Sequence, residues 1–280
     1  MKPVALLCAL LLAACSSGGR TVSPPPTPTA IPEVPTTKVV TIVLENHSDK
    51  AALDGMPYLK ELAQTYGRTS EYKSLTHPSL PNYLAMAAGS TFGITDDLDP
   101  KDHALPGQTV FDTGDAAVFA EGMTKNCQDY NADRYAVRHN AWTYFAAGHA
   151  TCLEHDKPLT ALDPASLPTV SLIVPDLCND AHDCDLDKAD AFLQDWVPKL
   201  TASSDYLAGR LAVVVTFDEV EHQSQGNVLT TVVAPKLKGS VVDAPLDHLA
   251  WCRWMTDLEG AAPLRDAAGA TSLGVAFGLT

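Results

Sequence analysis

Four apolar runs rich in β-branched side chains constrain the fold of this 280-residue chain more than any other feature. Uninterrupted runs of this length predict strands that are buried on both faces of a sheet. Helical patterns fit between the runs, and this alternation predicts an α/β sandwich around a largely parallel sheet. The predicted strands span residues 38–44, 170–174, 211–217 and 230–234, and the main predicted helices span 57–67, 187–200 and 248–258.

Acidic and amide side chains follow three of the predicted strands. Glu45 and Asn46 follow the first, Asp176 follows the second, and Asp218 and Glu219 follow the third. One acidic residue after a strand is usually a solvated turn, but ligands of open α/β sheets bind at the carboxyl ends of the strands. Hard divalent cations prefer oxygen ligands of this kind. The sequence therefore predicts a metal-assisted hydrolytic site in which Glu45, Asn46, Asp218 and Glu219 bind the metal.

A turn-rich stretch at residues 76–83 contains the candidate nucleophile, Ser79. Two prolines restrict the backbone around it, so we expect a strand arriving from Tyr72 to stop and a helix to begin near Pro81 or Asn82. The N-terminus of that helix would favour an anion such as a phosphate. Taken alone, these residues fit an ordinary helix N-cap. A cation at the strand ends would also bind Ser79 and ease formation of its alkoxide.

Activation of Ser79 by a histidine base has less support from the sequence. His77 lies two residues away across a proline turn, and side chains at this spacing rarely face each other. The sequence also lacks the Gly-x-Ser-x-Gly elbow that surrounds the serine in many Ser-His-Asp hydrolases. The predicted cation is therefore the better candidate for activating the serine.

Three histidines lie in polar or turn segments, namely His139, His182 and His248. His182 has the strongest setting, because Asp180 and Asp183 flank it after a predicted buried strand. It is a candidate metal ligand, phosphate clamp or leaving-group acid. For His139 and His248, the spacing supports a surface position and a place in the site equally.

The first 37 residues are expected to lie outside the globular fold. Residues 1–15 combine a lysine, a short apolar run and a small-residue cleavage site ending in Cys15, which is typical of a bacterial lipoprotein signal. Cys15 would carry the lipid. Residues 16–37 are rich in Ser, Gly, Pro and Thr and predict a disordered tether. We therefore expect an exported protein, lipid-anchored to the membrane or envelope, with one domain at residues 38–280.

The formal net charge of -15 disfavours nucleic acid as a partner, because no basic cluster offsets it. The same charge is consistent with a domain that gathers carboxylates around a cation. Simple solubility explains an acidic exported protein equally well. Charge therefore limits the class of partner without identifying the site.

The cysteines that follow the signal would lie in an oxidising compartment, where disulfides form. Cys178 and Cys184 are close enough in sequence to clip the loop between them. Cys127 and Cys152 would close a second loop, which leaves one cysteine unpaired. The alternative is a zinc site of Cys178, His182 and Cys184, which export and the many oxygen ligands elsewhere disfavour.

The blocks that carry these candidates resemble, in order, segments of the phosphoesterase family that includes bacterial phospholipases C and acid phosphatases. The similarity covers nearly the whole predicted domain, and several blocks together are specific where one would not be. The resemblance implies the α/β/α sandwich of the alkaline-phosphatase-like superfamily. The similar blocks are residues 43–48, 57–67, 76–84, 135–140, 173–183 and 216–219.

The resemblance also implies roles for individual residues. Ser79 would attack phosphorus in line and form a phosphoserine that water then hydrolyses, and Asn82 would contact the phosphate. At least one divalent metal ion would lie beside the serine. The implied metal ligands are Glu45, Asn46, Ser79, Asp218 and Glu219, and the implied pocket histidines are His139, His182 and His248.

Metal-dependent hydrolysis of phosphoric esters is the function that the resemblance implies. The chain is short for a phospholipase C of this family, which favours an acid-phosphatase-like phosphomonoesterase acting on a phosphorylated small molecule or a phospholipid. A phosphodiesterase or phospholipase C is the alternative within the same class. A non-catalytic envelope lipoprotein that binds a phosphorylated ligand is the alternative of another class, and the presence of the nucleophile and the proposed ligands disfavours it.

Overall fold

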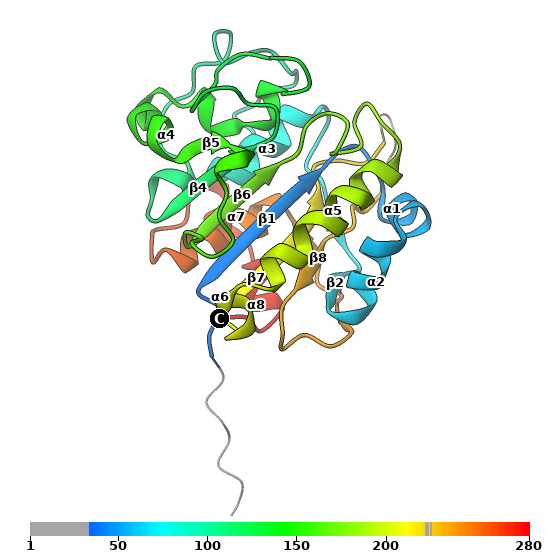
Figure 1. Cartoon of the computed structure of the whole chain (residues 1–280). Helices are drawn as coiled ribbons and strands as arrows, with labels where there is room; N and C mark the ends of the chain where they lie inside the picture. The colour runs from blue at the N-terminus through cyan, green and yellow to red at the C-terminus, as the bar shows by residue number, and fades with distance from the viewer. Residues whose placement is uncertain (1–33, 222–223, 225) are drawn as a thin grey trace, which may run out of the picture. The chain divides into compact units, whose positions relative to one another are not determined.

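The computed structural model describes residues 34–221, 224 and 226–280, so the predicted signal and Cys15, its predicted lipidation site, lie outside the described part (Figure 1). An eight-stranded sheet forms the centre of the described unit, in the order β5-β4-β6-β1-β7-β8-β2-β9. The strands are β1 (Lys38–Leu44), β2 (Gly67–Thr69), β3 (Tyr72–Lys73), β4 (Ala116–Ala120), β5 (Asp156–Pro158), β6 (Val170–Val174), β7 (Leu211–Phe217), β8 (Thr231–Val233), β9 (Ser240–Val242) and β10 (Leu246–Asp247).

Helical segments connect most of these strands. The α-helices are α1 (Asp49–Gly55), α2 (Pro57–Thr65), α3 (Ser79–Ala88), α4 (His149–His155), α5 (Leu186–Thr201), α6 (Ser204–Leu207), α7 (His248–Leu258) and α8 (Leu273–Ala276). Short 3-10 segments are η1 (Val110–Asp112), η2 (Val137–His139), η3 (Ala141–Tyr144), η4 (Ala146–Gly148), η5 (Leu159–Ala161) and η6 (Arg265–Gly269).

The sheet is largely parallel, as the sequence predicts. β5, β4, β6, β1 and β7 pair in parallel, whereas β8 is antiparallel to both β7 and β2. All residues of β6 and β7 are buried, and so are all residues of β1 except the half-buried Lys38. Covering both faces is what allows these strands to be continuous apolar runs.

Helices lie on both faces of the sheet, so the layer order is α/β/α (Figure 1). On one face, α5 packs beside β7 and contacts α2. On the other, α3 packs against α7, and each of the ten residues of α3 is buried. An all-buried helix needs apolar side chains on every side, and the sequence from Leu84 to Ala88 supplies them. The predicted sandwich is therefore confirmed.

Two of the differences from the predictions concern the candidate nucleophile and a strand of the sheet. The helix expected to begin near Pro81 or Asn82 begins at Ser79 itself, with Pro78 as its N-cap. Proline is well tolerated in the first turn of a helix because its missing N–H has no intrahelical partner there. The second difference is β4, an alanine-rich strand that the sequence pattern did not reveal.

Both predicted disulfides are present, joining Cys127 to Cys152 and Cys178 to Cys184. Cys252 is a free, buried thiol. The alternative zinc site of Cys178 and Cys184 is therefore not formed, because the two sulfur atoms are bonded to each other. The disulfide between Cys178 and Cys184 closes the loop of residues 179–183, which follows β6.

Candidate active site

The parallel pairing of β1 and β7 brings two buried carboxylates together. Leu44 pairs with Phe217 at the last position of the two strands, so Glu45 and Asp218 leave the sheet side by side. The Asp218 N–H donates to the Leu44 carbonyl at 2.9 Å. The Asn46 N–H donates to Asp218 Oδ1 at 3.2 Å. Both carboxylates are fully buried at the carboxyl ends of their strands.

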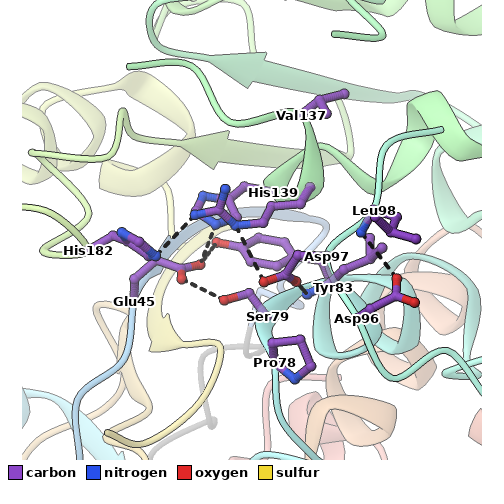
Figure 2. Close-up of polar contacts among 12 residues, drawn as sticks. Glu45, Pro78, Ser79, Tyr83, Asp96, Asp97, Leu98, Val137, His139 and His182 are labelled. Carbon is purple, nitrogen blue, oxygen red and sulfur yellow. Dashed lines mark hydrogen bonds and ion pairs between the residues drawn. The ribbon is translucent and has the colours of Figure 1, made fainter. Parts of the chain in front are cut away.

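Ser79 lies at the first position of α3 and faces this pair. Its hydroxyl donates to Glu45 Oε2 at 2.9 Å. Tyr83, one helical turn further on, donates its hydroxyl to Glu45 Oε1 at 2.7 Å. Figure 2 shows Ser79, Tyr83 and Glu45 meeting in this way. Sequence analysis missed Tyr83, although its spacing of four residues from Ser79 places both side chains on one helix face.

His139 lies between two of the buried carboxylates. Its Nε2 is 3.3 Å from Glu45 Oε1, and its Nδ1 is 3.3 Å from Asp180 Oδ2. The ring stacks on Tyr83 with a centroid distance of 5.0 Å, so its orientation is fixed (Figure 2). Burial lowers the pKa of His139 well below its usual value, with the nearby Arg138 charge acting in the same direction. The imidazole is therefore neutral and has a lone pair available for a metal or a proton.

Of the acidic residues that follow β6, Asp180 reaches the site and Asp176 does not. Asp176 Oδ1 instead accepts the backbone N–H groups of Cys178 and Asn179, both at 2.9 Å, and shapes the turn after the strand. The chain then returns to the carboxyl end of β1, where the Asp180 carbonyl accepts the Glu45 N–H at 2.8 Å. The available signal in the sequence was the position of Asp180 inside a short disulfide loop.

The four buried carboxyl groups of the cluster all hold protons more tightly than usual. Burial, followed by the charges of Asp218 and Asp180, raises the pKa of Glu45 well above its usual value. Burial raises the pKa of Asp218 to about 7 and that of Asp180 to about 8. Burial and the Asp218 charge raise the pKa of Glu219 to about 9. The protein alone therefore does not compensate the negative charge of this cluster.

The residues present fit a divalent cation. Asp180 Oδ2 and Asp218 Oδ2 are buried and make no hydrogen bond to any described residue. Glu45, His139 and Asp180 each offer a ligand atom, and these atoms lie within 4.8 Å of one another. Carboxylate oxygens with one imidazole are a usual ligand set for divalent metals. A bound cation would interact with these two oxygens and would stabilise the ionised forms of the buried carboxyl groups.

Asn82 holds the turn that leads into Ser79. Its Oδ1 accepts the Leu75 N–H at 2.9 Å, and its Nδ2 donates to the Thr76 carbonyl at 2.8 Å. Nδ2 also lies 3.4 Å from Glu219 Oε2. The amide is therefore beside the cluster, but backbone groups occupy most of its hydrogen-bonding capacity. Its predicted phosphate contact stays a prediction.

Glu219 and Asn46, the other predicted ligands, lie at the border of the cluster. Glu219 Oε2 is 2.9 Å from Nδ1 of His77, so this histidine contacts a carboxylate of the site. Asn46 has a positive φ of 55° and lines a neighbouring cavity of about 600 Å³ with His182 and Asp183. Their roles as metal ligands stay predictions.

The structure brings His182 to the edge of the site but does not bring His248 there. His182 is partly exposed, and its ring centroid is 6.1 Å from that of His139. His248 is fully buried. Its Nε2 is 2.5 Å from the Asp218 carbonyl, and its Nδ1 is 3.4 Å from the Tyr72 hydroxyl. Both ring nitrogens therefore contact groups of the fold, and His248 lies behind Asp218 and supports its backbone.

The raised carboxyl pKa values predict that the metal-free protein is less stable at alkaline pH. A carboxyl group with a raised pKa in the folded state contributes stability below its unfolded pKa, near 4, and loses it as pH rises through its folded pKa. For Asp218, Asp180 and Glu219 this loss extends to about pH 7, 8 and 9. In chelator, Tm is therefore expected to fall between about pH 5 and pH 9.

A divalent cation should reverse this trend, because it stabilises the ionised carboxylates. Differential scanning fluorimetry with chelator and with added metal measures both effects. The rise in Tm on adding metal is expected to be larger at pH 8 than at pH 5. An equal Tm across this range in chelator would show that the four carboxylates are not coupled to folding.

Comparisons with known proteins identify the family of this chain. Residues 52–223 match the family model described as the phosphoesterase family. A phosphatidylinositol-3-phosphatase from Mycobacterium tuberculosis is 30% identical over 239 residues, which cover 78% of each chain. A probable acid phosphatase from Kluyveromyces lactis is 29% identical over 74% of this chain and 54% of its own length. The chain thus spans about half the length of that yeast relative.

Solved structures show the same fold at low sequence identity. A protein of the alkaline phosphatase superfamily from Vibrio parahaemolyticus has a TM-score of 0.57 and 11% identity, with 88% of this chain and 74% of that chain covered. The lipoteichoic acid synthase LtaP from Listeria monocytogenes has a TM-score of 0.55 and 9% identity, with 84% and 76% covered. The chain therefore belongs to the phosphoesterase family and is a phosphoric ester hydrolase on an alkaline-phosphatase-like fold.

Proposed function

We propose that the protein hydrolyses phosphoric monoesters with a divalent metal ion and a phosphoserine intermediate at Ser79. One observation carries the proposal. The Ser79 hydroxyl begins a buried helix and donates to Glu45 inside a cluster of buried carboxylates. A serine in this position has both an acceptor for its proton and a helix N-terminus that favours an anion.

The side chains of the site have separate roles in the proposed reaction. Glu45 Oε2 accepts the Ser79 proton, and the Tyr83 hydroxyl fixes the orientation of that carboxylate. Ser79 Oγ then forms a bond to phosphorus as the bond from phosphorus to the ester oxygen breaks, and the leaving oxygen takes a proton from solvent. Water next attacks the phosphoserine, the bond from Ser79 Oγ to phosphorus breaks, Ser79 Oγ takes back the proton held by Glu45, and phosphate leaves.

A divalent cation would be held by the buried oxygen and nitrogen donors of the cluster. It would supply positive charge that lowers the cost of the serine alkoxide and of charge on the phosphoryl oxygens. Glu45 and Asp218 belong to the predicted ligand set, and the geometry adds His139 and Asp180. Each of these four side chains is buried and faces the cluster.

A monoester preference is the proposal for substrate, supported by the acid phosphatase and phosphatidylinositol-3-phosphatase names of the relatives. A phosphorylated small molecule or a phospholipid-derived monoester would fit such a preference. A phosphodiesterase or phospholipase C is the second candidate, because leaving-group recognition depends on loops more than on the metal cluster. Membrane anchoring through Cys15 is also a proposal. No helix among the described residues is long and apolar enough to span a bilayer.

Chelation tests the metal dependence and the substrate class together. Wild-type protein is assayed on p-nitrophenyl phosphate, bis-p-nitrophenyl phosphate and phosphatidylcholine, before and after prolonged treatment with chelator. We expect the monoester to be the best substrate and its hydrolysis to fall at least about 100-fold in chelator. Adding back Mg²⁺, Mn²⁺, Ca²⁺ or Zn²⁺ singly should restore it and identify the effective ion.

Two results would change the proposal. Full activity of protein shown by elemental analysis to be metal-free would remove the metal from the mechanism. Binding of inorganic phosphate without turnover of any ester would favour the non-catalytic phosphate-binding alternative. Chelator premixed with excess metal serves as the control for direct effects of the chelator.

A further inference from the structure

A basic side chain that the mechanism above does not use lies at the edge of the site. Arg138 directly precedes His139 in the 3-10 segment η2. Its guanidinium Nη2 is 3.0 Å from Nε2 of His182, and its Nε is 3.8 Å from Asp97 Oδ2. The side chain is 19% exposed, so most of it is enclosed while one edge is open to solvent.

Asp97 connects this arginine to the segment that carries the nucleophile. Asp97 Oδ1 accepts the backbone N–H of Leu80, the residue after Ser79, at 2.9 Å. Figure 2 shows Asp97 beside Ser79, on the side away from Glu45. Its second carboxylate oxygen pairs with Arg138. The position of the guanidinium relative to the helix N-terminus is therefore set by one carboxylate that contacts both.

The hydrogen bond from Arg138 also fixes the state of His182. A guanidinium can only donate, so Nε2 of His182 accepts and carries no proton. The ring proton is then on Nδ1, which donates to Asp183 Oδ1 at 2.7 Å. Asp183, His182, Arg138 and Asp97 form one chain of polar contacts. In this state His182 orients the arginine and has no Nε2 proton to give to a leaving group.

The charge of Arg138 acts on several groups of the site. Burial raises the pKa of Glu219 and of Asp180, and the Arg138 charge partly offsets this rise; the same charge contributes to the lowered pKa of His139. The Arg138 Nε is buried without a hydrogen bond to any described residue, and Asp97 ties the guanidinium to the start of α3, the helix that carries the nucleophile. A guanidinium fork matches the geometry of phosphoryl oxygens.

We propose that Arg138 binds the non-bridging phosphoryl oxygens of the substrate and favours the doubly charged monoester over the singly charged diester. Asp97 and His182 act as positioning residues for it. The inference rests on the proposed function and assigns it a specificity-determining residue. A diester has one fewer negative oxygen to offer, and its second ester group would compete for the space beside the guanidinium.

Variants of Arg138 test this assignment. Arg138→Ala should lower kcat/KM for p-nitrophenyl phosphate by about 100- to 1,000-fold. Losses of this size follow when an enzyme loses one hydrogen-bond donor that stabilises negative charge in the transition state. It should lower kcat/KM for bis-p-nitrophenyl phosphate by less than about 10-fold, because the lost interaction is mainly with the extra charge. Arg138→Lys should give an intermediate loss for the monoester, because a lysine keeps the charge but not the fork.

Arg134→Ala is the matched control. Arg134 lies four residues earlier, is 57% exposed, and pairs with Asp176 at 3.8 Å, outside the cluster. It should leave both rates unchanged. Asp97→Asn should shift the monoester-to-diester ratio in the same direction as Arg138→Ala but less, which a merely structural role would not do. Tm of each variant identifies any loss of folding.

The outcomes separate this inference from the proposed function. Equal losses on monoester and diester at unchanged Tm, or no loss in Arg138→Ala, would overturn the role of Arg138 while leaving the hydrolase intact. If the wild type hydrolyses neither ester, the proposed function fails, and binding of inorganic phosphate by calorimetry then tests the arginine. Weaker phosphate binding in Arg138→Ala than in Arg134→Ala would support its assignment, and equal binding would overturn it.

Discussion

Replacing Ser79 with alanine is expected to lower kcat for phosphomonoester hydrolysis by roughly 10³- to 10⁶-fold, as for other enzymes that lose their nucleophile. The hydroxyl removed is the one that donates to Glu45 at 2.9 Å in the buried cluster. No other described serine or threonine hydroxyl bonds to that carboxylate, so no neighbour can replace it. Steady-state kinetics on p-nitrophenyl phosphate with saturating metal measures the effect.

Ser90→Ala is the matched control for this variant. Ser90 lies just beyond the other end of α3, where its hydroxyl accepts the Phe92 N–H at 3.2 Å. Its removal should leave kcat within about twofold of the wild type, as for most substitutions away from a site. Ser79→Ala should still bind metal, because the buried carboxylates remain, and its kinetics are therefore measured at saturating metal. Activity of Ser79→Ala equal to that of the wild type would refute the nucleophilic role.

Replacing Asp218 with asparagine is expected to reduce metal affinity by at least about 100-fold. Replacing a residue that only hydrogen-bonds to a metal ligand already lowers metal affinity or activity about 10- to 100-fold. Asp218 Oδ1 accepts two backbone N–H groups, from Asn46 and Glu219, and an amide oxygen can still accept them. The substitution removes the negative charge of the carboxylate, whose Oδ2 makes no hydrogen bond to a described residue. Isothermal titration calorimetry and kinetics at limiting metal give the loss.

The same variant should be more stable than the wild type when both are metal-free at pH 8. Burial raises the pKa of Asp218 to about 7, so the wild-type group is largely ionised there at a cost that asparagine does not carry. Asp176→Asn is the control, because Asp176 also follows a central strand but bonds to backbone N–H groups of its own turn. Unchanged metal affinity in Asp218→Asn would remove it from the ligand set.

The sequence was sufficient to predict the central strands of the sheet and about half of the candidate site. Strands 38–44 and 211–217 have the predicted boundaries, because uninterrupted β-branched runs leave little choice of structure. Once they pair in parallel, the residues after them must meet, and this brings Glu45 beside Asp218. β4 was missed because its alanine-rich sequence, Ala116–Ala120, carries little strand preference of its own.

The other half of the site depends on long-range packing that no local pattern specifies. Asp180 reaches the cluster because the chain turns after β6 and its carbonyl accepts the Glu45 N–H. His248 looked equivalent to His139 in the sequence. α7 places it behind Asp218, whereas η2 places His139 between two carboxylates. Such differences depend on which surfaces the helices pack against, and sequence spacing does not contain that information.

A crystal structure of the metal-loaded protein with vanadate tests the nucleophile and the cation in one measurement. Vanadate adopts the five-coordinate geometry of in-line phosphoryl transfer and binds tightly where that transition state is stabilised. We predict vanadium bonded to Ser79 Oγ, with a cation contacting the same oxygen, Glu45 and Asp218. Vanadate bound elsewhere, or a Ser79 hydroxyl that still donates to Glu45 with no cation beside it, would contradict the mechanism.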